Sequence, residues 1–101
     1  MPVNIIENWT EITGEVRQVR AEVGVPDFSV VEMDVRKVDS VEDFANLLKN
    51  IEGAKIDVLF PDELVRALGI TQGKKIACRV RRAGIDRIYV HREHITVLGN
   101  R

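Results

Sequence analysis

The sequence predicts a mainly β fold, a five-stranded barrel with two short helices, and three observations carry this prediction. Apolar and polar residues alternate over several segments of strand length. Two other segments carry the start and stop signals of short helices, and Gly or Pro residues separate many of these segments. The 101 residues, 45% of them hydrophobic and 31% charged, suffice for one core, so we expect a single domain over residues 1–101.

The first two predicted strands cover residues 14–23 and 28–38. In the first, Val16 and Val19 lie on opposite sides, which suits a strand that is partly covered on both faces, and a bulge or bend is expected near Gln18. The second is the clearest strand of the chain, because its apolar residues alternate with charged ones. One of its faces is therefore expected to lie in the core and the other in solvent.

Helices are predicted at residues 41–50 and 61–68. Ser40 followed by Asp43 is similar to a capping box, and apolar residues then recur at helical spacing. The second helix begins with proline at its first position, carries two acidic residues in its first turn and ends at Gly69. We therefore expect two short amphipathic helices, one before and one after the third strand.

Period-two alternation also predicts the remaining strands. The third covers residues 55–60, and a hairpin follows over residues 75–91, whose last strand continues to Val97 after a kink around Glu93 and His94. The alternation and the helical stripes direct the following side chains into the expected core: Val31, Met33, Val35, Ile56, Val58, Leu64, Leu68, Ile76, Cys78, Val80, Ile88 and Val90.

Five strands with a helix between the third and the fourth give the layout of an OB fold, a partly open Greek-key barrel. Residues 56–97 begin IDVLFPDELVRALGITQGKKIACRVRRAGIDRIYV, and this segment resembles the C-terminal half of OB-fold domains of the replication protein A type. Within it, LGITQGKKI is similar to a turn of molybdate-binding MOP and TOBE domains and of swapped-hairpin DNA-binding regulators. The OB resemblance implies binding of single-stranded nucleic acid near the loops at residues 22–27 and 82–86.

The candidate binding surface lies on the last hairpin. Arginine guanidinium groups neutralise phosphates and stack on bases, and a tyrosine ring offers a further stacking face. We expect single-stranded DNA or RNA to contact five residues of this hairpin and two arginines of the first strand: Arg79, Arg81, Arg82, Arg87, Tyr89, Arg17 and Arg20.

Two alternative functions are open at this point. The arginines can instead pair with carboxylates across neighbouring strands, and the chain would then be a protein-interaction subunit of a larger complex. A net charge of −1 and an aromatic content of 5% favour this alternative. The resemblance of the turn implies a third function, the binding of a small oxyanion through backbone amides in the manner of TOBE domains.

The sequence carries no arrangement of catalytic residues, so we expect a binding protein that needs no cofactor rather than an enzyme. His91 and His94 are three apart on an extended strand and point to opposite sides, which does not favour a metal site. Cys78 alternates with core residues and is the one cysteine, which indicates a small core residue in a reducing, cytoplasmic compartment. No apolar run is long enough to cross a bilayer, so no membrane is expected as a partner.

Overall fold

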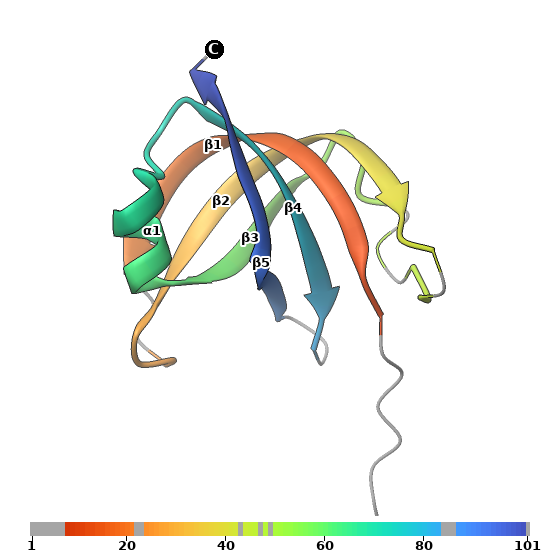
Figure 1. Ribbon diagram of the computed structural model, residues 1–101, viewed down its shortest axis with the longest axis horizontal. Coiled ribbons are helices and arrows are strands. Elements are labelled where there is room, and N and C mark those ends of the chain that lie inside the picture. Colours follow the sequence, from red (N-terminus) through yellow and green to blue (C-terminus); the bar gives the residue numbers. More distant parts are fainter. Residues whose placement is uncertain are drawn as a thin grey trace, which may run out of the picture.

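The computed structural model describes residues 8–21, 24–42, 44–46, 48, 50–83 and 87–100. The chain is mainly β, as predicted, and one short helix separates the third strand from the fourth (Figure 1). The elements follow in the order β1 (Thr10–Ala21), β2 (Phe28–Ser40), β3 (Lys55–Pro61), α1 (Asp62–Leu68), β4 (Lys74–Arg82) and β5 (Ile88–Asn100).

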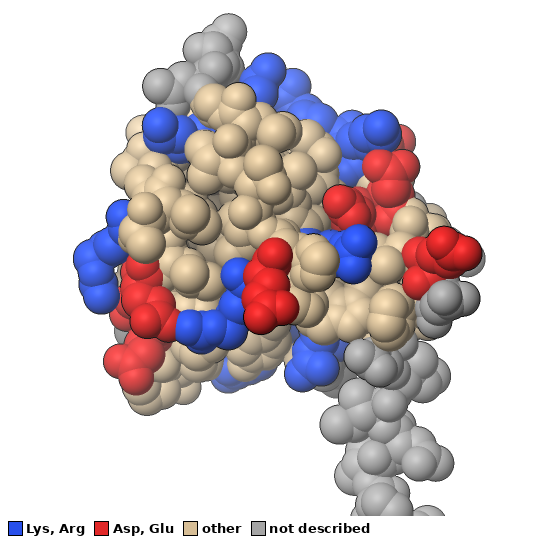
Figure 2. Space-filling view, viewed as in Figure 1, with Lys and Arg blue, Asp and Glu red and all other residues tan. Residues whose placement is uncertain are grey.

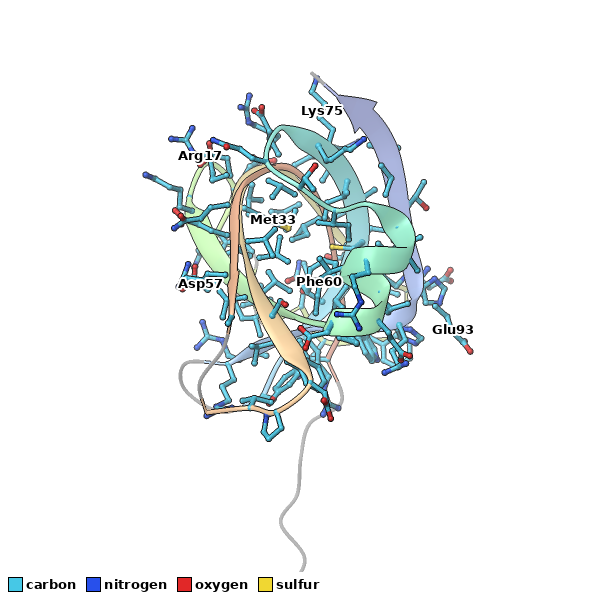
Figure 3. All side chains as sticks on the ribbon, turned by 90° about the vertical axis from the view of Figure 1, so that its left-hand side faces the viewer. Arg17, Met33, Asp57, Phe60, Lys75 and Glu93 are labelled. Carbon is cyan, nitrogen blue, oxygen red and sulfur yellow. The ribbon has the colours of Figure 1, made fainter. Side chains whose placement is uncertain are left out.

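The five strands form one sheet that closes on itself in the order β1-β2-β3-β5-β4, a closed barrel. Strand β1 pairs antiparallel with β2 along one edge and with β4 along the other. Strands β2 and β3, and β4 and β5, are also antiparallel, whereas β3 and β5 meet in parallel through Leu59 and Tyr89. The interior is filled by apolar side chains, among which Met33 and Phe60 point inward in Figure 3.

Two bulges bend the β1–β2 pair. Arg17 is an extra residue on β1, because Val16 pairs with Met33 and Gln18 pairs with the adjacent residue of β2, Glu32. The bulge expected near Gln18 is thus confirmed. The prediction that Val16 and Val19 lie on opposite sides is wrong, because the extra residue shifts the alternation by one and both valines pack in the core.

The helix predicted at residues 41–50 is wrong: the described residues of this segment lie in turns, a bend and one isolated bridge. The bridge joins Asn8 to Ala45, and the Trp9 N–H donates a hydrogen bond to the Ala45 carbonyl at 3.2 Å. The backbone before β1 therefore bonds to the Ala45 carbonyl, a group that would accept a hydrogen bond from within the predicted helix. Asp43 of the expected capping box lies outside the described residues.

Asn46 completes this non-helical arrangement through its side chain. Its Oδ1 accepts hydrogen bonds from Thr10 Oγ1 at 2.8 Å and from the Leu48 N–H at 3.0 Å. Its Nδ2 donates to Ser40 Oγ at 3.2 Å, so the serine expected to cap a helix instead binds this loop at the end of β2. Side-chain bonds to nearby backbone compete with helix formation, and here the contact with Thr10 favours them.

Helix α1 lies at one end of the barrel, as Figure 3 shows, and buries little of itself. No residue of α1 is fully buried; Val65 packs against the core, Leu64 is half-buried and Leu68 is 37% exposed. The prediction that Leu68 belongs to the core is therefore wrong. Gly69 adopts the left-handed conformation that ends the helix. The next residue, Ile70, is buried, whereas Leu68 is not.

Most of the predicted core is confirmed, with Ile56 and Ile88 half-buried at its margin. The sequence prediction also omitted Ile12, which is fully buried, because β1 begins at Thr10 and not at residue 14. The side chains buried as predicted are Val31, Met33, Val35, Val58, Ile76, Cys78, Val80 and Val90.

The different burial of Val58 and Leu68 generates a stability prediction. Val58→Ala should lower the free energy of unfolding by about 2–4 kcal/mol, because it removes methyl groups from a fully buried position and leaves a cavity. Leu68→Ala should cost less than about 1 kcal/mol, since its side chain is partly in water. Urea denaturation followed by circular dichroism measures both, and equal losses would contradict this account of α1.

Gly14 generates a second stability prediction. It pairs with both Val35 and Ile76, and a Cβ atom at this position would lie 2.3 Å from the Asp34 carbonyl oxygen. Gly14→Ala must therefore push β1 away from β2 and should cost about 1–3 kcal/mol or more of stability. Gly24→Ala is the matched control, because no described residue would lie closer than 4.0 Å to its Cβ atom. A Gly14→Ala protein as stable as this control would contradict the close strand approach.

Candidate nucleic-acid interface

The outer face of the β4–β5 hairpin carries the predicted site. Val80 pairs with Val90 and Arg81 pairs with Tyr89. Both valines are buried, so Arg81 and Tyr89 share the outer face, as does Arg79, two residues before Arg81. The structure thus brings three of the predicted residues onto one surface.

Three of the predicted arginines are bound to carboxylates. On β4, Arg79 Nε lies 3.3 Å from Glu11 Oε2, and these two residues are direct partners across the β1–β4 pair. The contact is half-exposed, so the pair is weak in itself. It nevertheless lowers the positive charge that Arg79 contributes to the outer face.

Arg17 and Arg20 lie on β1 and contact acidic residues of neighbouring strands. Arg17 Nη1 is 3.2 Å from Asp34 Oδ2, and Arg20 Nη2 is 2.7 Å from Asp57 Oδ2. A second carboxylate, that of Glu32, lies 3.7 Å from Arg20 Nη1. Both arginines therefore lie close to negative charge, and Arg20 lines one groove together with Arg82 of the hairpin.

Arg81 and Arg87 differ from these three. Within the described part of the chain, no carboxylate lies at ion-pair distance from either guanidinium group. Arg87 Nη1 lies 3.5 Å from Tyr89 Oη, a long contact that places the guanidinium beside the phenol. Arg87 Nη2 lies 4.0 Å from the position that a Cβ atom on Gly24 would take, so the residue after the second predicted loop lies beside Gly24 of the first. Residues 22, 23 and 84–86 of these loops lie outside the described residues.

Arg82 occupies a different position from the other hairpin arginines. Its backbone is held by Asn8, whose Oδ1 accepts the Arg82 N–H at 2.8 Å and whose Nδ2 donates to the Arg82 carbonyl at 3.2 Å. It shares the inward alternation of Val80, and at the end of β4 it lines a groove of about 660 Å³ with Ile56 and Ile88. Arg82 therefore does not belong to the outer face of Arg81.

The outer face also contains aromatic rings besides Tyr89, and the sequence prediction placed His91 on this face but not Trp9, Phe28 or His94. Phe28 contacts Tyr89 edge to face, with ring centroids 5.7 Å apart. The ring centroid of His91 lies 4.7 Å from that of Trp9 and 4.4 Å from that of His94. Because Asn8 bonds Arg82 and Thr10 pairs with Val80, Trp9 lies opposite Arg81. No local pattern around Trp9 signals this, since β1 and β4 are far apart in the sequence.

A large bulge in β5 holds the rings of His91 and His94 together, so the prediction that they point to opposite sides is wrong. Val80 pairs with Val90 and Cys78 pairs with Ile95, so four residues of β5 stand opposite one residue of β4. The kink expected around Glu93 and His94 is thus confirmed. The Glu93 N–H donates to His91 Nδ1 at 3.1 Å, which orients the ring. No group of three metal-ligating side chains forms among the described residues, here or elsewhere.

The two sides of the β5 rings differ in charge. On the side of α1, a groove of about 490 Å³ is lined in part by Asp27, Asp62 and Glu63. Arg92 forms an ion pair with Glu63 in this groove. On the other side lie the β4 arginines. Over the face in Figure 2, acidic and basic side chains are accordingly interspersed, and no broad basic surface forms.

The turn LGITQG, which the sequence relates to oxyanion-binding domains, uses its amides within the protein. The N–H groups of Gly69 and Ile70 donate to carbonyls of α1. The Gly73 N–H donates to the Val16 carbonyl at 2.9 Å, and the Lys74 N–H donates to Thr71. These four amides connect α1 to β4 and to β1.

Comparison of the chain with protein-family models finds no match, and comparison with curated proteins finds no significant similarity. None of the helical residues that the structure describes forms a segment with the length and apolar character needed to cross a membrane.

Cys78 generates a prediction about reactivity. Burial, with a smaller contribution from the Glu11 carboxylate, raises the pKa of the Cys78 thiol to about 12. At pH 8 this lowers the thiolate fraction about a thousandfold relative to a pKa of 9.0, so the folded protein should react far more slowly with a thiol reagent than the urea-unfolded chain. Because the chain has one cysteine, the colour released by the reagent reports this position alone. Equal rates in the folded and unfolded states would contradict the burial of Cys78.

Proposed function

We propose that the chain is a non-catalytic, OB-like module that binds single-stranded DNA or RNA on the outer face of β4 and β5. The arrangement of the strands supports the comparison with the OB fold. The closed sheet has the order β1-β2-β3-β5-β4, with α1 between β3 and β4 at one end. In OB folds the ligand lies on the barrel face and against the loops after the first and fourth strands. Here the Arg87 guanidinium, which follows the second of these loops, lies beside Gly24 of the first.

The observation that carries the proposal is the setting of Arg81 and Arg87. Both lie next to Tyr89, one across the strand pair and the other at its hydroxyl, and neither has a carboxylate partner among the described residues. Two cations beside an aromatic ring match the two needs of a single strand, since its phosphates require positive charge and its bases require a ring to stack on.

A protein partner is the competing function, and two observations favour it. Arg17, Arg20 and Arg79 already contact carboxylates, which lowers the positive charge available for phosphates. A shallow groove of about 580 Å³, lined in part by Trp9 and Leu64, also offers apolar contact area. The oxyanion alternative gains no support from the LGITQG turn, in which the N–H groups of Gly69, Ile70 and Gly73 already donate to protein carbonyls.

Binding of a labelled oligo-thymidylate at two salt concentrations tests the proposal. Arg81→Ala and Arg87→Ala should each weaken binding and reduce the dependence of log K on log salt by roughly one phosphate contact. Tyr89→Ala should cost about 1–3 kcal/mol of binding free energy through lost stacking. Arg36→Ala is the matched control, because this exposed arginine is bound to Glu15, which pairs with Lys75 at the opposite end of β4 from Arg81, and it should change neither quantity.

Fluorescence anisotropy of the labelled strand measures all of these affinities, and circular dichroism verifies that each variant is folded. Unchanged affinity in the folded Arg81→Ala/Arg87→Ala double variant would remove the hairpin from the binding site. Affinity that does not change with salt would argue against phosphate contacts altogether. Either result would leave the protein-interaction function ahead.

A further inference from the structure

The aromatic rings on β5 form two neighbouring groups. Tyr89 belongs to one, with Phe28, and His91 belongs to the other, with Trp9 and His94. Tyr89 and His91 are two residues apart on an extended strand, a separation of about 7 Å. Val90 between them is buried, so both rings face outward. The surface therefore offers two ring platforms side by side.

The second platform is held in place by hydrogen bonds to its backbone and to one of its rings. The backbone of Trp9 is held in place, because the Asn8 side chain bonds the Arg82 backbone and the backbone N–H of Trp9 donates to the Ala45 carbonyl. Its ring packs against His91. His91 is oriented by the Glu93 N–H within the bulge. Rings that are already positioned lose little conformational entropy when a planar ligand stacks on them.

The charges beside the platforms are unequal. Arg81 lies on the β4 side, across from Tyr89 and opposite Trp9, and has no carboxylate partner among the described residues. On the α1 side, the groove is lined by three carboxylates, those of Asp27, Asp62 and Glu63, and by two arginines, Arg66 and Arg92, so acidic groups outnumber basic ones there by one. A polyanionic backbone is thus favoured along β4 and disfavoured along α1.

Resting on the proposed function, we propose that the surface holds two successive nucleotides of one strand. One base stacks at Tyr89 and the next stacks at Trp9 and His91. The phosphate between them lies over Arg81, so the backbone follows β4 and the bases point toward β5 and α1. The chemical class of ligand is therefore a single strand of at least two nucleotides, and a mononucleotide can occupy one platform only.

Trp9 provides the test, because it is the one tryptophan and its fluorescence reports this platform alone. Titration with oligo-thymidylate should quench Trp9 emission in parallel with the anisotropy of the labelled strand. Trp9→Leu keeps apolar bulk but removes the ring, and should weaken oligonucleotide binding about tenfold with an unchanged salt dependence. Trp9→Phe should retain most of the affinity, and Leu98→Ala, which changes an exposed apolar residue farther along β5, should have no effect.

Combining variants tests whether the platforms hold different bases. The losses from Tyr89→Ala and Trp9→Leu should multiply in the double variant when the ligand is an oligonucleotide, because independent contacts add in free energy. A double variant no weaker than either single one would overturn the two-base arrangement. Oligonucleotide binding that leaves Trp9 emission and the Trp9→Leu affinity unchanged would overturn the second platform and leave the proposed function standing. Absence of any binding by the unaltered protein at low salt would overturn both.

Discussion

The pairing of β1 with β4 is the interaction on which the rest of the structure depends. It closes the sheet, since β1 already pairs with β2 along its other edge. One strand can serve both neighbours only if it bends, and the bend is made where Gly14 lets β2 approach and where Arg17 is an extra residue. Without this pairing β4 would be an edge strand, and the inward side chains of Ile76 and Val80 would lose the neighbours that bury them.

Closure also determines the outer surface. The segment before β1 continues along β4, so Asn8 reaches the Arg82 backbone and Trp9 reaches His91 on the far side of β4. Residues from the start, the middle and the end of the chain thereby share one face. The same closure places Glu11 beside Arg79. It therefore adds the Trp9 ring to this face and lowers the positive charge that Arg79 contributes to it.

What could be predicted from the sequence was local. The strands and α1 follow from alternation, from Pro61 and from Gly69, which act within a few residues. The helix predicted at residues 41–50 was wrong because Asn46 bonds to Thr10, 36 positions earlier, and Ala45 bonds to Trp9, and no local window contains those partners. For the same reason the site was predicted in part: the hairpin arginines and Tyr89 lie on neighbouring strands of one hairpin, whereas the position of Trp9 follows from closure alone.

The bulge at residues 91–94 separates β5 into two parts, each of which pairs with β4 in its own register. Before it, Val90 faces the core and Tyr89 the surface; after it, Ile95 resumes pairing with Cys78. Because the pairing restarts after the bulge, a change in the length or sequence of residues 91–94 does not shift which residues of either part face inward. The outer surface that this short segment presents can therefore change while the barrel that carries it stays the same.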